Sequence, residues 1–366
     1  MKTTAHTLIA FSVRTTACLL LLHVTARAGA VLNPASFTSL GANPFAAAGN
    51  YTVNTSGATP VLTLPNATTI NGVVSGGIAV FTFSNLTIGT GVTIKGFGTL
   101  PLALLSQDFF NITGGTIDVS GSDGQANNGP TGGAGGAGGP GGFAGGKGGT
   151  GSLAAPFATD GGGPGGGTSG TTGGGFGGTG GKAFAGVAGG NSYGDLTVKL
   201  EGGSGGGGGL GAPIFSFGSG GGGGGGGAIE LGAVTTLTIG GEVLANGGTG
   251  VNAGANGGGS GSGGGILIHA HDVTLTGSLK ANGGVGVTDG DGGGGGRIAI
   301  LTASGTLTGN GTTSVAGGLH GPNATLDPIG NGQPGVITVG QIPEPSTWVL
   351  LALAIAVLPG VSRHRA

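Results

Sequence analysis

The chain has 366 residues, of which 99 are glycine and 7% are charged, and its formal net charge is −2. This composition fits neither an ordinary globular domain nor a disordered chain kept open by charge. Residues 29–342 carry twelve acidic residues, all 13 except Glu344, and six of the 11 basic ones, so their net charge is near −6. We expect no binding to nucleic acid, which needs a basic surface to neutralise phosphates.

The first 28 residues have the layout of a secretory signal peptide. Basic residues Lys2 and Arg14 precede an apolar run that includes Leu19–Leu22, and Ala26-Arg27-Ala28 follows. The apolar run is much shorter than the roughly 20 residues that a membrane-spanning helix needs. We therefore predict cleavage after Ala28, with Ala26 and Ala28 as the small residues of the cleavage site.

The single cysteine, Cys18, lies inside the predicted signal peptide and before its leucine run. A lipidated cysteine would follow the apolar region at the cleavage point, so a lipoprotein is not expected. Removal of Cys18 leaves a mature chain without disulfides, a thiol nucleophile or a cysteine metal site.

The other end combines three features. Pro343-Glu344-Pro345 is followed by the uncharged apolar stretch Trp348–Val361 and then by Arg363 and Arg365. The prolines keep the chain extended and accessible, the apolar stretch predicts a short hydrophobic helix that enters a membrane, and the arginines act as a cytoplasmic stop.

This arrangement resembles the PEP-CTERM sorting signal over about the last 25 residues. The resemblance implies recognition by an exosortase, a membrane transpeptidase-like enzyme, and transient membrane anchoring before the protein reaches the cell surface or the medium. It also implies a matrix or biofilm setting, but no particular biochemical act. The alternative is a permanent single-span anchor that contains a chance Pro-Glu-Pro.

Strand signals occur on both sides of a glycine-rich region. Residues 29–120 are rich in Thr, Val, Ile and Phe with period-two alternation, as in Val80–Ile88. In residues 228–341, Ala-Asn-Gly-Gly at 245–248 recurs 36 residues later at 281–284, and weaker copies are expected at 297–318 and 102–121. Each copy predicts short strands with one apolar face, which stacking of the copies would bury.

The fold class that follows is all-β, an irregular parallel β-helix or β-solenoid with long glycine-rich loops or a glycine-rich insertion. We expect a signal peptide at 1–28, strand-rich parts of the solenoid at 29–120 and 228–341, the insertion at 121–227 and the sorting signal at 342–366. Within the insertion, residues 132–143 show a Gly-Gly-X period of three. That period suits packed polyproline-II-like helices, but a flexible loop is an equal alternative.

Two clusters are candidates for metal sites. His269, His271 and Asp272 alternate on a predicted strand, but no third ligand is visible on a neighbouring copy, so outward-facing exposed residues are preferred. Asp289 and Asp291 lie in a glycine-rich acidic stretch whose spacing matches no calcium loop, so a solvated turn is preferred. No metal or cofactor is expected.

A parallel β-helix also suggests polysaccharide-degrading enzymes, which need clustered carboxylates or basic residues. Arg297 is the single arginine between the two signals, and the acids Asp108, Asp118 and Asp272 are scattered. No catalytic residue is predicted. The Gly-x-Gly-x-x-Gly matches lack a surrounding βαβ unit and carry no weight for nucleotide binding.

Two other patterns bear on the surface. Thr-Leu-Thr occurs at 236–238, 274–276 and 306–308, but the spacing to the repeat marker differs, so we expect no aligned threonine ladder. Asn-x-Ser/Thr sequences leave glycosylation a weak hypothesis, and they begin at Asn50, Asn54, Asn66, Asn85, Asn111, Asn310 and Asn323.

The leading hypothesis is an exported, exosortase-processed structural protein of the cell surface or extracellular matrix. The alternative is an adhesin that binds an extracellular polysaccharide or another cell through the long face of the solenoid. A polysaccharide-degrading enzyme on the same fold is the third.

Overall fold

The computed structural model describes residues 31–151, 158–183, 187–212, 217–253, 256–322 and 330–342. They lie in one structural unit that spans Ala30 to Ile342. The fold is all-β, and within the described residues the one helical element is the short 3-10 helix η1 (Pro34–Ser36).

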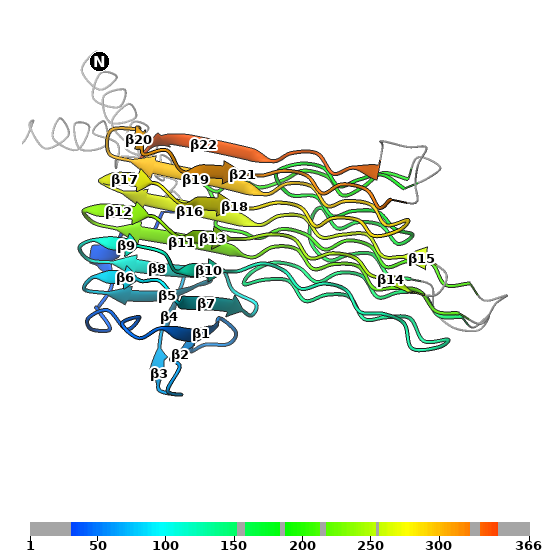
Figure 1. The fold of residues 1–366 in the computed structure, drawn as a ribbon, viewed down its shortest axis with the longest axis horizontal. Helices are drawn as coiled ribbons and strands as arrows, with labels where there is room; N and C mark the ends of the chain where they lie inside the picture. Colours follow the sequence, from blue (N-terminus) through cyan, green and yellow to red (C-terminus); the bar gives the residue numbers. More distant parts are fainter. Residues whose placement is uncertain are drawn as a thin grey trace, which may run out of the picture. The chain divides into compact units, whose positions relative to one another are not determined.

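Three sheets hold nearly all of the strands (Figure 1). Sheet A has the order β21-β18-β13-β10-β7-β1-β2-β3, with β21 (Thr312–Ser314), β18 (Ser278–Lys280), β13 (Glu242–Leu244), β10 (Thr116–Asp118), β7 (Val92–Phe97), β1 (Gly49–Asn54), β2 (Val61–Thr63) and β3 (Thr69–Asn71). Sheet B has the order β22-β19-β16-β11-β8-β5-β4, with β22 (Val336–Gln341), β19 (Arg297–Thr302), β16 (Gly265–Ala270), β11 (Ala228–Ala233), β8 (Leu102–Ser106), β5 (Ile78–Phe83) and β4 (Val73–Ser75). Sheet C has the order β20-β17-β12-β9-β6, with β20 (Leu307–Thr308), β17 (Asp272–Leu275), β12 (Thr236–Ile239), β9 (Phe110–Ile112) and β6 (Leu86–Ile88). A separate antiparallel ribbon joins β14 (Asn252–Ala253) and β15 (Asn256–Gly257).

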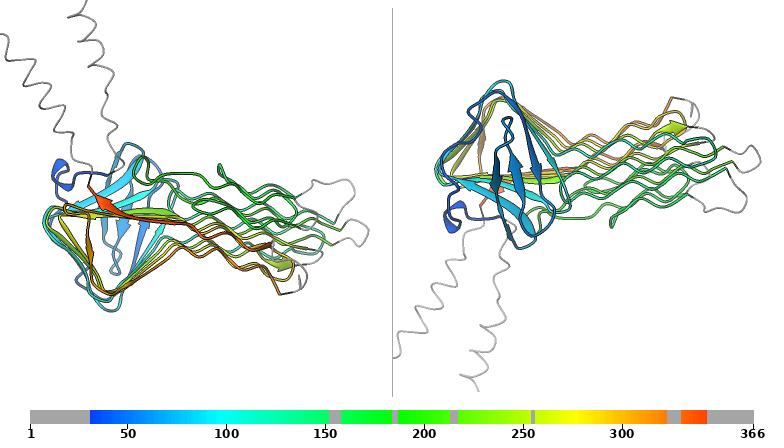
Figure 2. Two further views of the ribbon diagram at one scale, coloured as in Figure 1. Left: turned by 90° about the horizontal axis from the view of Figure 1, so that it is seen from above. Right: turned by 90° about the horizontal axis from the view of Figure 1, so that it is seen from below.

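The chain visits the sheets in a fixed order, B then C then A, and each pass pairs in parallel with the one before it. The first pass is β5, β6 and β7, and the last complete pass in the described residues is β19, β20 and β21, after which β22 begins another. The expected copies at 102–121, 228–248, 265–284 and 297–318 therefore stack on one another, as predicted. Figure 2 shows the three sheets as the sides of a triangle.

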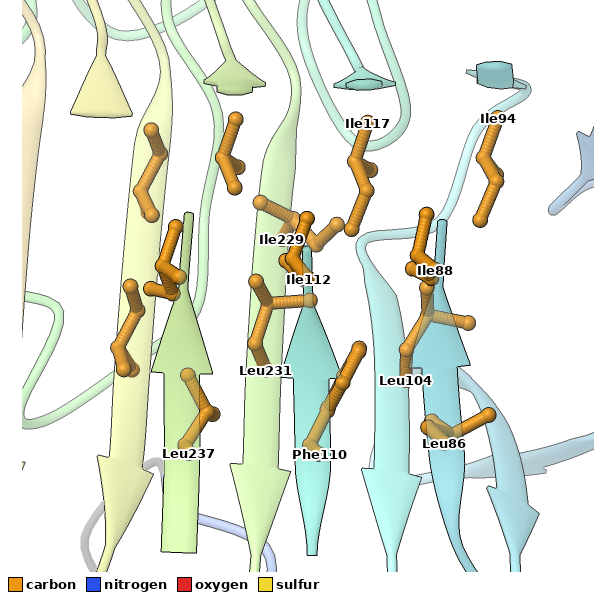
Figure 3. Packing of buried hydrophobic residues seen from close by; sticks show 14 of the residues in the cluster. Leu86, Ile88, Ile94, Leu104, Phe110, Ile112, Ile117, Ile229, Leu231 and Leu237 are labelled. Carbon is orange, nitrogen blue, oxygen red and sulfur yellow. The ribbon is translucent and has the colours of Figure 1, made fainter. Parts of the chain in front are cut away.

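Side chains from successive passes form aligned rows in the interior. Leu86, Phe110 and Leu237 occupy equivalent positions on neighbouring strands of sheet C, and Leu104 and Leu231 do so on sheet B (Figure 3). All five are completely buried. Burial of such a side chain stabilises a fold by about 1.5–3 kcal/mol. These rows therefore contribute much of the free energy that favours stacking of successive passes.

Sheet B differs from the prediction of one apolar face per strand. Strands β5, β8, β11 and β16 are buried at every residue. A second group of apolar side chains, here the outer cluster, covers the face of sheet B that points away from the interior. It joins strand residues to Phe176, Leu196 and Leu200 of the glycine-rich region, so that region packs on the sheet and excludes water from both faces.

The described residues of the glycine-rich region form packed, hydrogen-bonded segments, which favours the packed alternative over the flexible loop. Segment 219–227 lies at its centre and is completely enclosed. Its N–H groups donate in turn to carbonyls of three other segments, within 143–149, 256–262 and 119–125. Its carbonyls accept from three more, within 133–139, 203–209 and 248–251. Six extended segments thus surround the central one.

The hydrogen bonds between two such segments recur at every third residue. Gly133, Gly136 and Gly139, for example, donate to Ser219, Gly222 and Gly225. A period of three without strands or α-helices is typical of polyproline-II-like helices, the ordered alternative considered above. Glycine is needed here for close approach, since a Cβ at Gly224 would meet the carbonyl oxygen of Ala137.

This glycine bundle extends beyond the predicted insertion at 121–227. The described residues within 245–264, 281–296 and 315–335 also lie between sheet A and sheet B in the chain and hydrogen-bond within the bundle. All of these excursions leave from the corner between sheets A and B, so the bundle runs away from that corner (Figure 2).

The repeated Ala-Asn-Gly-Gly sequence lies at the same corner and stacks as an asparagine ladder. The side-chain oxygen of Asn246 accepts from the N–H of Asn282 at 2.9 Å, and that of Asn282 accepts from the N–H of Ala316 at 2.9 Å. In the preceding pass the hydroxyl of Ser120 has the same role, accepting from the N–H of Asn246. The marker therefore satisfies backbone groups where the chain leaves the sheet.

We predict that Gly224→Ala lowers the free energy of unfolding by about 3 kcal/mol, because the added methyl group meets fixed backbone on a neighbouring segment. The matched control is Gly89→Ala, where a Cβ has open space and the backbone conformation suits alanine. Urea unfolding followed by circular dichroism measures both. Equal stability of the two variants would contradict the packing described here.

Candidate functional site

The residues predicted for processing lie outside the described residues, and they are Ala26, Ala28, Pro343, Glu344, Pro345, Arg363 and Arg365. The predicted hydrophobic helix Trp348–Val361 lies outside them too. Within the ranges that the structure describes, no helix combines the length and apolar character needed to cross a membrane.

The described residues that border the two predicted signals meet on one surface. Val31, Leu32 and Phe37 at the N-terminal side and Ile342 at the C-terminal side all pack against the outer cluster on sheet B. The N–H of Ile342 also donates to the carbonyl of Thr302 at 3.0 Å. Both junctions are therefore held by the body of the protein.

A buried histidine–glutamate pair anchors the N-terminal junction. Nε2 of His269 lies 2.9 Å from Oε1 of Glu230, and the N–H of Leu32 donates to that same oxygen at 2.7 Å. His269 is 3% exposed and Glu230 is completely buried. The expectation that His269 is an exposed outward-facing residue was wrong, because the outer face of sheet B is itself covered.

His271 and Asp272 conform to that expectation. Both are exposed, and Nδ1 of His271 lies 3.0 Å from Oδ2 of Asp272. The three side chains of the sequence cluster do not converge, because His269 faces Glu230 on the covered side of sheet B. Among the described residues no group of three or more His, Cys, Asp or Glu side chains could hold a metal ion.

The Asp289–Asp291 stretch divides in the same way. Asp289 is exposed in a turn, as expected. Asp291 is 2% exposed, and the expectation of a solvated turn was wrong for it. Its carboxylate accepts from the Thr171 hydroxyl at 3.1 Å and lies 3.1 Å from Nδ1 of His320, so it joins three segments inside the glycine bundle.

Arg297 fastens the glycine bundle to sheet B. Its Nε donates to the carbonyl of Tyr193 at 2.9 Å, and its guanidinium lies 5.6 Å from the ring centre of Phe176. Burial lowers the pKa of Arg297, and the nearby charges of Asp195 and Glu201 oppose that effect. Burial likewise raises the pKa of the Tyr193 hydroxyl, which donates to Gly202.

The scattered acids have separate partners. Asp108 accepts from the Thr235 hydroxyl, and Asp118 pairs with Lys95 on the outer face of sheet A at 2.7 Å. Burial raises the pKa of Asp118, but hydrogen bonds from Lys95 and Ser120 outweigh it, so the pKa lies below its ordinary value of 3.8. Asp272 pairs with His271. The structure does not bring these carboxylates together.

The Thr-Leu-Thr triplets do not align as pairs, as expected, since Thr236 lies opposite Asp272. A single row of threonines does form. Thr238 pairs with Thr274, and Thr274 pairs with Thr308, along the outer face of sheet C. The hydroxyls of Thr274 and Thr308 lie 2.9 Å apart. The row therefore takes one threonine from each triplet: the last of the first triplet, the first of the second and the last of the third.

The far end of the glycine bundle, beside β14 and β15, is here called the tip, and large apolar side chains are exposed in described segments that lead to it. Phe217 is 54% exposed and Leu319 is 64% exposed. Leu210, in such a segment, is 46% exposed, and its carbonyl accepts from the side chain of Asn256 in β15 (Figure 1). Large apolar side chains exposed outside the sheets are candidates for contacts with a partner.

The two ends of the stacked sheets differ. The antiparallel strands β2, β3 and β4 flank the N-terminal end, and Phe45 packs edge-to-face on Tyr51 and Phe83 across the interior. At the other end β22 is the last strand of sheet B. This end exposes Val336, Ile337 and Val339 of β22 at 40%, 42% and 45%, and the opposite edge of sheet B exposes Val73 and Val74 of the shorter β4 at 51% and 40%.

Comparison of this chain with protein-family models, with curated proteins and with solved structures found no match. The surfaces above are therefore assigned from their geometry. Sequence reasoning missed Glu230, the Arg297–Phe176 contact and the open β22 edge. For Glu230 a signal existed, since a charge within the otherwise apolar Ala228–Leu231 indicates a specific partner.

We predict that Glu230→Ala destabilises the protein by roughly 3 kcal/mol, because it leaves His269 and the Leu32 N–H buried without their acceptor. Thermal unfolding, together with hydrogen exchange at Leu32, measures the loss. Glu242→Ala on the exposed face of sheet A serves as control and should change stability by about 0.5 kcal/mol or less. Similar effects of both variants would refute the anchoring role.

Proposed function

We propose that this chain is an exported, exosortase-processed structural protein of the cell surface or extracellular matrix. One observation carries the proposal: the structural unit runs from Ala30 to Ile342, between the predicted cleavage after Ala28 and the motif that begins at Pro343. Removal of both signals would leave the unit whole. An exosortase-like enzyme is the implied partner, with transient membrane anchoring through the predicted C-terminal helix.

We further propose that the three-sheet body is an irregular parallel β-helix. The fixed order of sheets B, C and A, and the parallel register between passes, support this interpretation. The glycine bundle then serves as a stiff lateral extension. Its backbone groups bond within the bundle, and its surface has few charges, which suits a building element better than a catalyst.

A second candidate function is adhesion to an extracellular polysaccharide, and the apolar tip favours it. The tip lies at the far end of the glycine bundle from the sheets, where a stiff extension would present it to a partner. Aromatic and aliphatic side chains can pack against the apolar faces of sugar rings. A polysaccharide-degrading activity receives no such support, because the acids named above have separate partners.

The sorting proposal predicts a processed protein in the native host and an unprocessed one in a host that lacks its exosortase. The protein isolated from envelope and medium should have the intact mass of a chain that ends near Pro343. The protein from a host without its exosortase should still contain Trp348–Ala366. Replacing Glu344 and Pro345 by alanine should give the same retention. Pro334→Ala, a nearby exposed proline outside the motif, is the control and should leave processing unchanged. An identical, unprocessed mass in both hosts would replace sorting by permanent anchoring.

The adhesion candidate predicts that Phe217→Ser weakens binding of the mature protein to the host's extracellular polysaccharide by about tenfold, the loss of one well-packed contact. Co-sedimentation with purified polysaccharide measures it. Val198→Ser removes an equally exposed side chain, 50% against 54%, near the base of the bundle and should have no effect. If neither wild type nor variant binds saturably, the protein is a matrix element without this adhesive role.

A further inference from the structure

We propose that the open C-terminal end of the stacked sheets is an assembly surface, and that its occupant is a second copy of this chain, paired through strand β22. The inference rests on the proposed function, because processing near Pro343 leaves no further chain to cover this edge. It goes beyond that function by naming a partner and a geometry.

The first argument comes from burial. Ile337 and Val339 align with Ile298 and Ile300 of the preceding strand, whose side chains belong to the interior rows. Ile298 and Ile300 are 1% and 0% exposed, whereas Ile337 and Val339 are 42% and 45% exposed. β22 therefore continues the interior pattern, but no described strand lies on its far side.

The second argument comes from backbone hydrogen bonds. The N–H groups of Val336 and Ile342 donate to the preceding pass, at Gly296 and Thr302. Backbone N–H and C=O groups of successive residues point to opposite sides of a strand. Those of Ile337, Val339 and Gln341 therefore point to the open edge. Exposed strand edges usually carry charged residues or proline, and β22 has neither.

Charge indicates that the partner is another copy. Residues 301–319 and 330–342, which form this end, contain no Asp, Glu, Lys or Arg, although residues 29–342 have a net charge near −6. Among the described residues, two copies that meet at this end bring no like charges together, whereas other orientations bring acidic residues of the two copies closer. Head-to-tail stacking would not continue the parallel ladders, because the edge strands at the other end, β3 and β4, pair antiparallel with their neighbours.

A two-fold axis through Val339 satisfies these constraints. It pairs β22 antiparallel with the β22 of the second copy, placing Val339 opposite Val339 and Ile337 opposite Gln341. The residues that point to the open edge then all meet one another. The interior faces of both copies lie on the same side of the joined sheet, and the glycine bundles run in opposite directions.

The experiment is sedimentation equilibrium of mature protein purified from the native host, with the C-terminus of the same sample defined by intact mass. We expect a concentration-dependent dimer. Val339→Pro removes an N–H that points to the open edge and leaves the hydrogen bonds to β19 in place. Because of the two-fold symmetry, the dimer loses two intermolecular hydrogen bonds. The dissociation constant should therefore rise roughly 30-fold or more.

A second variant covers the possibility that proline disturbs folding. Thr338→Glu adds like charges beside the axis and should also favour the monomer, whereas Thr69→Glu on β3, the edge strand at the opposite end of sheet A, should leave the dimer unchanged. Circular dichroism checks that each variant is folded.

A monomeric wild type at about 100 µM, well above the micromolar constants of typical weak dimers, would overturn the inference. So would a dimer that neither β22 variant weakens. If the mass shows residues 343–366 retained, the sorting proposal fails separately. The same variants, tested in the detergent-solubilised full chain, then decide whether β22 still pairs.

Discussion

In the glycine bundle each interior N–H must reach a carbonyl of a neighbouring segment, and a Cβ at these positions would occupy the space of that carbonyl. Segment 219–227 meets this requirement with six neighbours, donating to three and accepting from three. Glycine provides little apolar surface to bury and loses much conformational entropy on folding. The bundle is therefore held by backbone hydrogen bonds and by the sheets from which its segments start.

The sheets supply what the bundle lacks. Stacked rows such as Leu86, Phe110 and Leu237 fill the interior, and every excursion leaves from one corner, so neighbouring segments begin already aligned. The bundle in turn supplies Phe176, Leu196 and Leu200 to the outer face of sheet B. The sheets thus align the segments of the bundle, and the bundle buries the outer face of sheet B. This mutual dependence explains why they form one unit.

Sequence reasoning recovered the features that depend on local periodicity. Alternation located the strands of 78–121 and 228–341, and the recurrence of Ala-Asn-Gly-Gly identified copies that stack. It could not show that sheet B is covered on both faces, because Phe176 and Leu196 lie far along the chain from the strands they cover. The burial of His269 and of Asp291 follows from such distant contacts, and for the same reason neither could be predicted.

The candidate surfaces depend even more on long-range geometry. The spacing to the repeat marker indicated that the first two threonine triplets are out of register by two residues, but only the strand pairing shows that Thr238, Thr274 and Thr308 form a single row. In sequence, β22 resembles any other strand. Its apolar residues are exposed only because it is the last strand of sheet B. The predicted sorting signal, by contrast, depends only on a contiguous motif, so its prediction needs no fold at all.

The three-residue period of the bundle also restricts how such a protein can change in length. Inserting or deleting three residues in each leg of an excursion would keep the inward positions, mostly glycine with buried residues such as Ser204 and Ser219, and the hydrogen bonds in phase. A single-residue insertion would instead turn a side chain such as Ala134 or Ala137, now exposed, toward a neighbouring backbone. The reach of the extension can thus vary in steps of about 9 Å, one turn of a polyproline-II-like helix, while the sheets that support it stay unchanged.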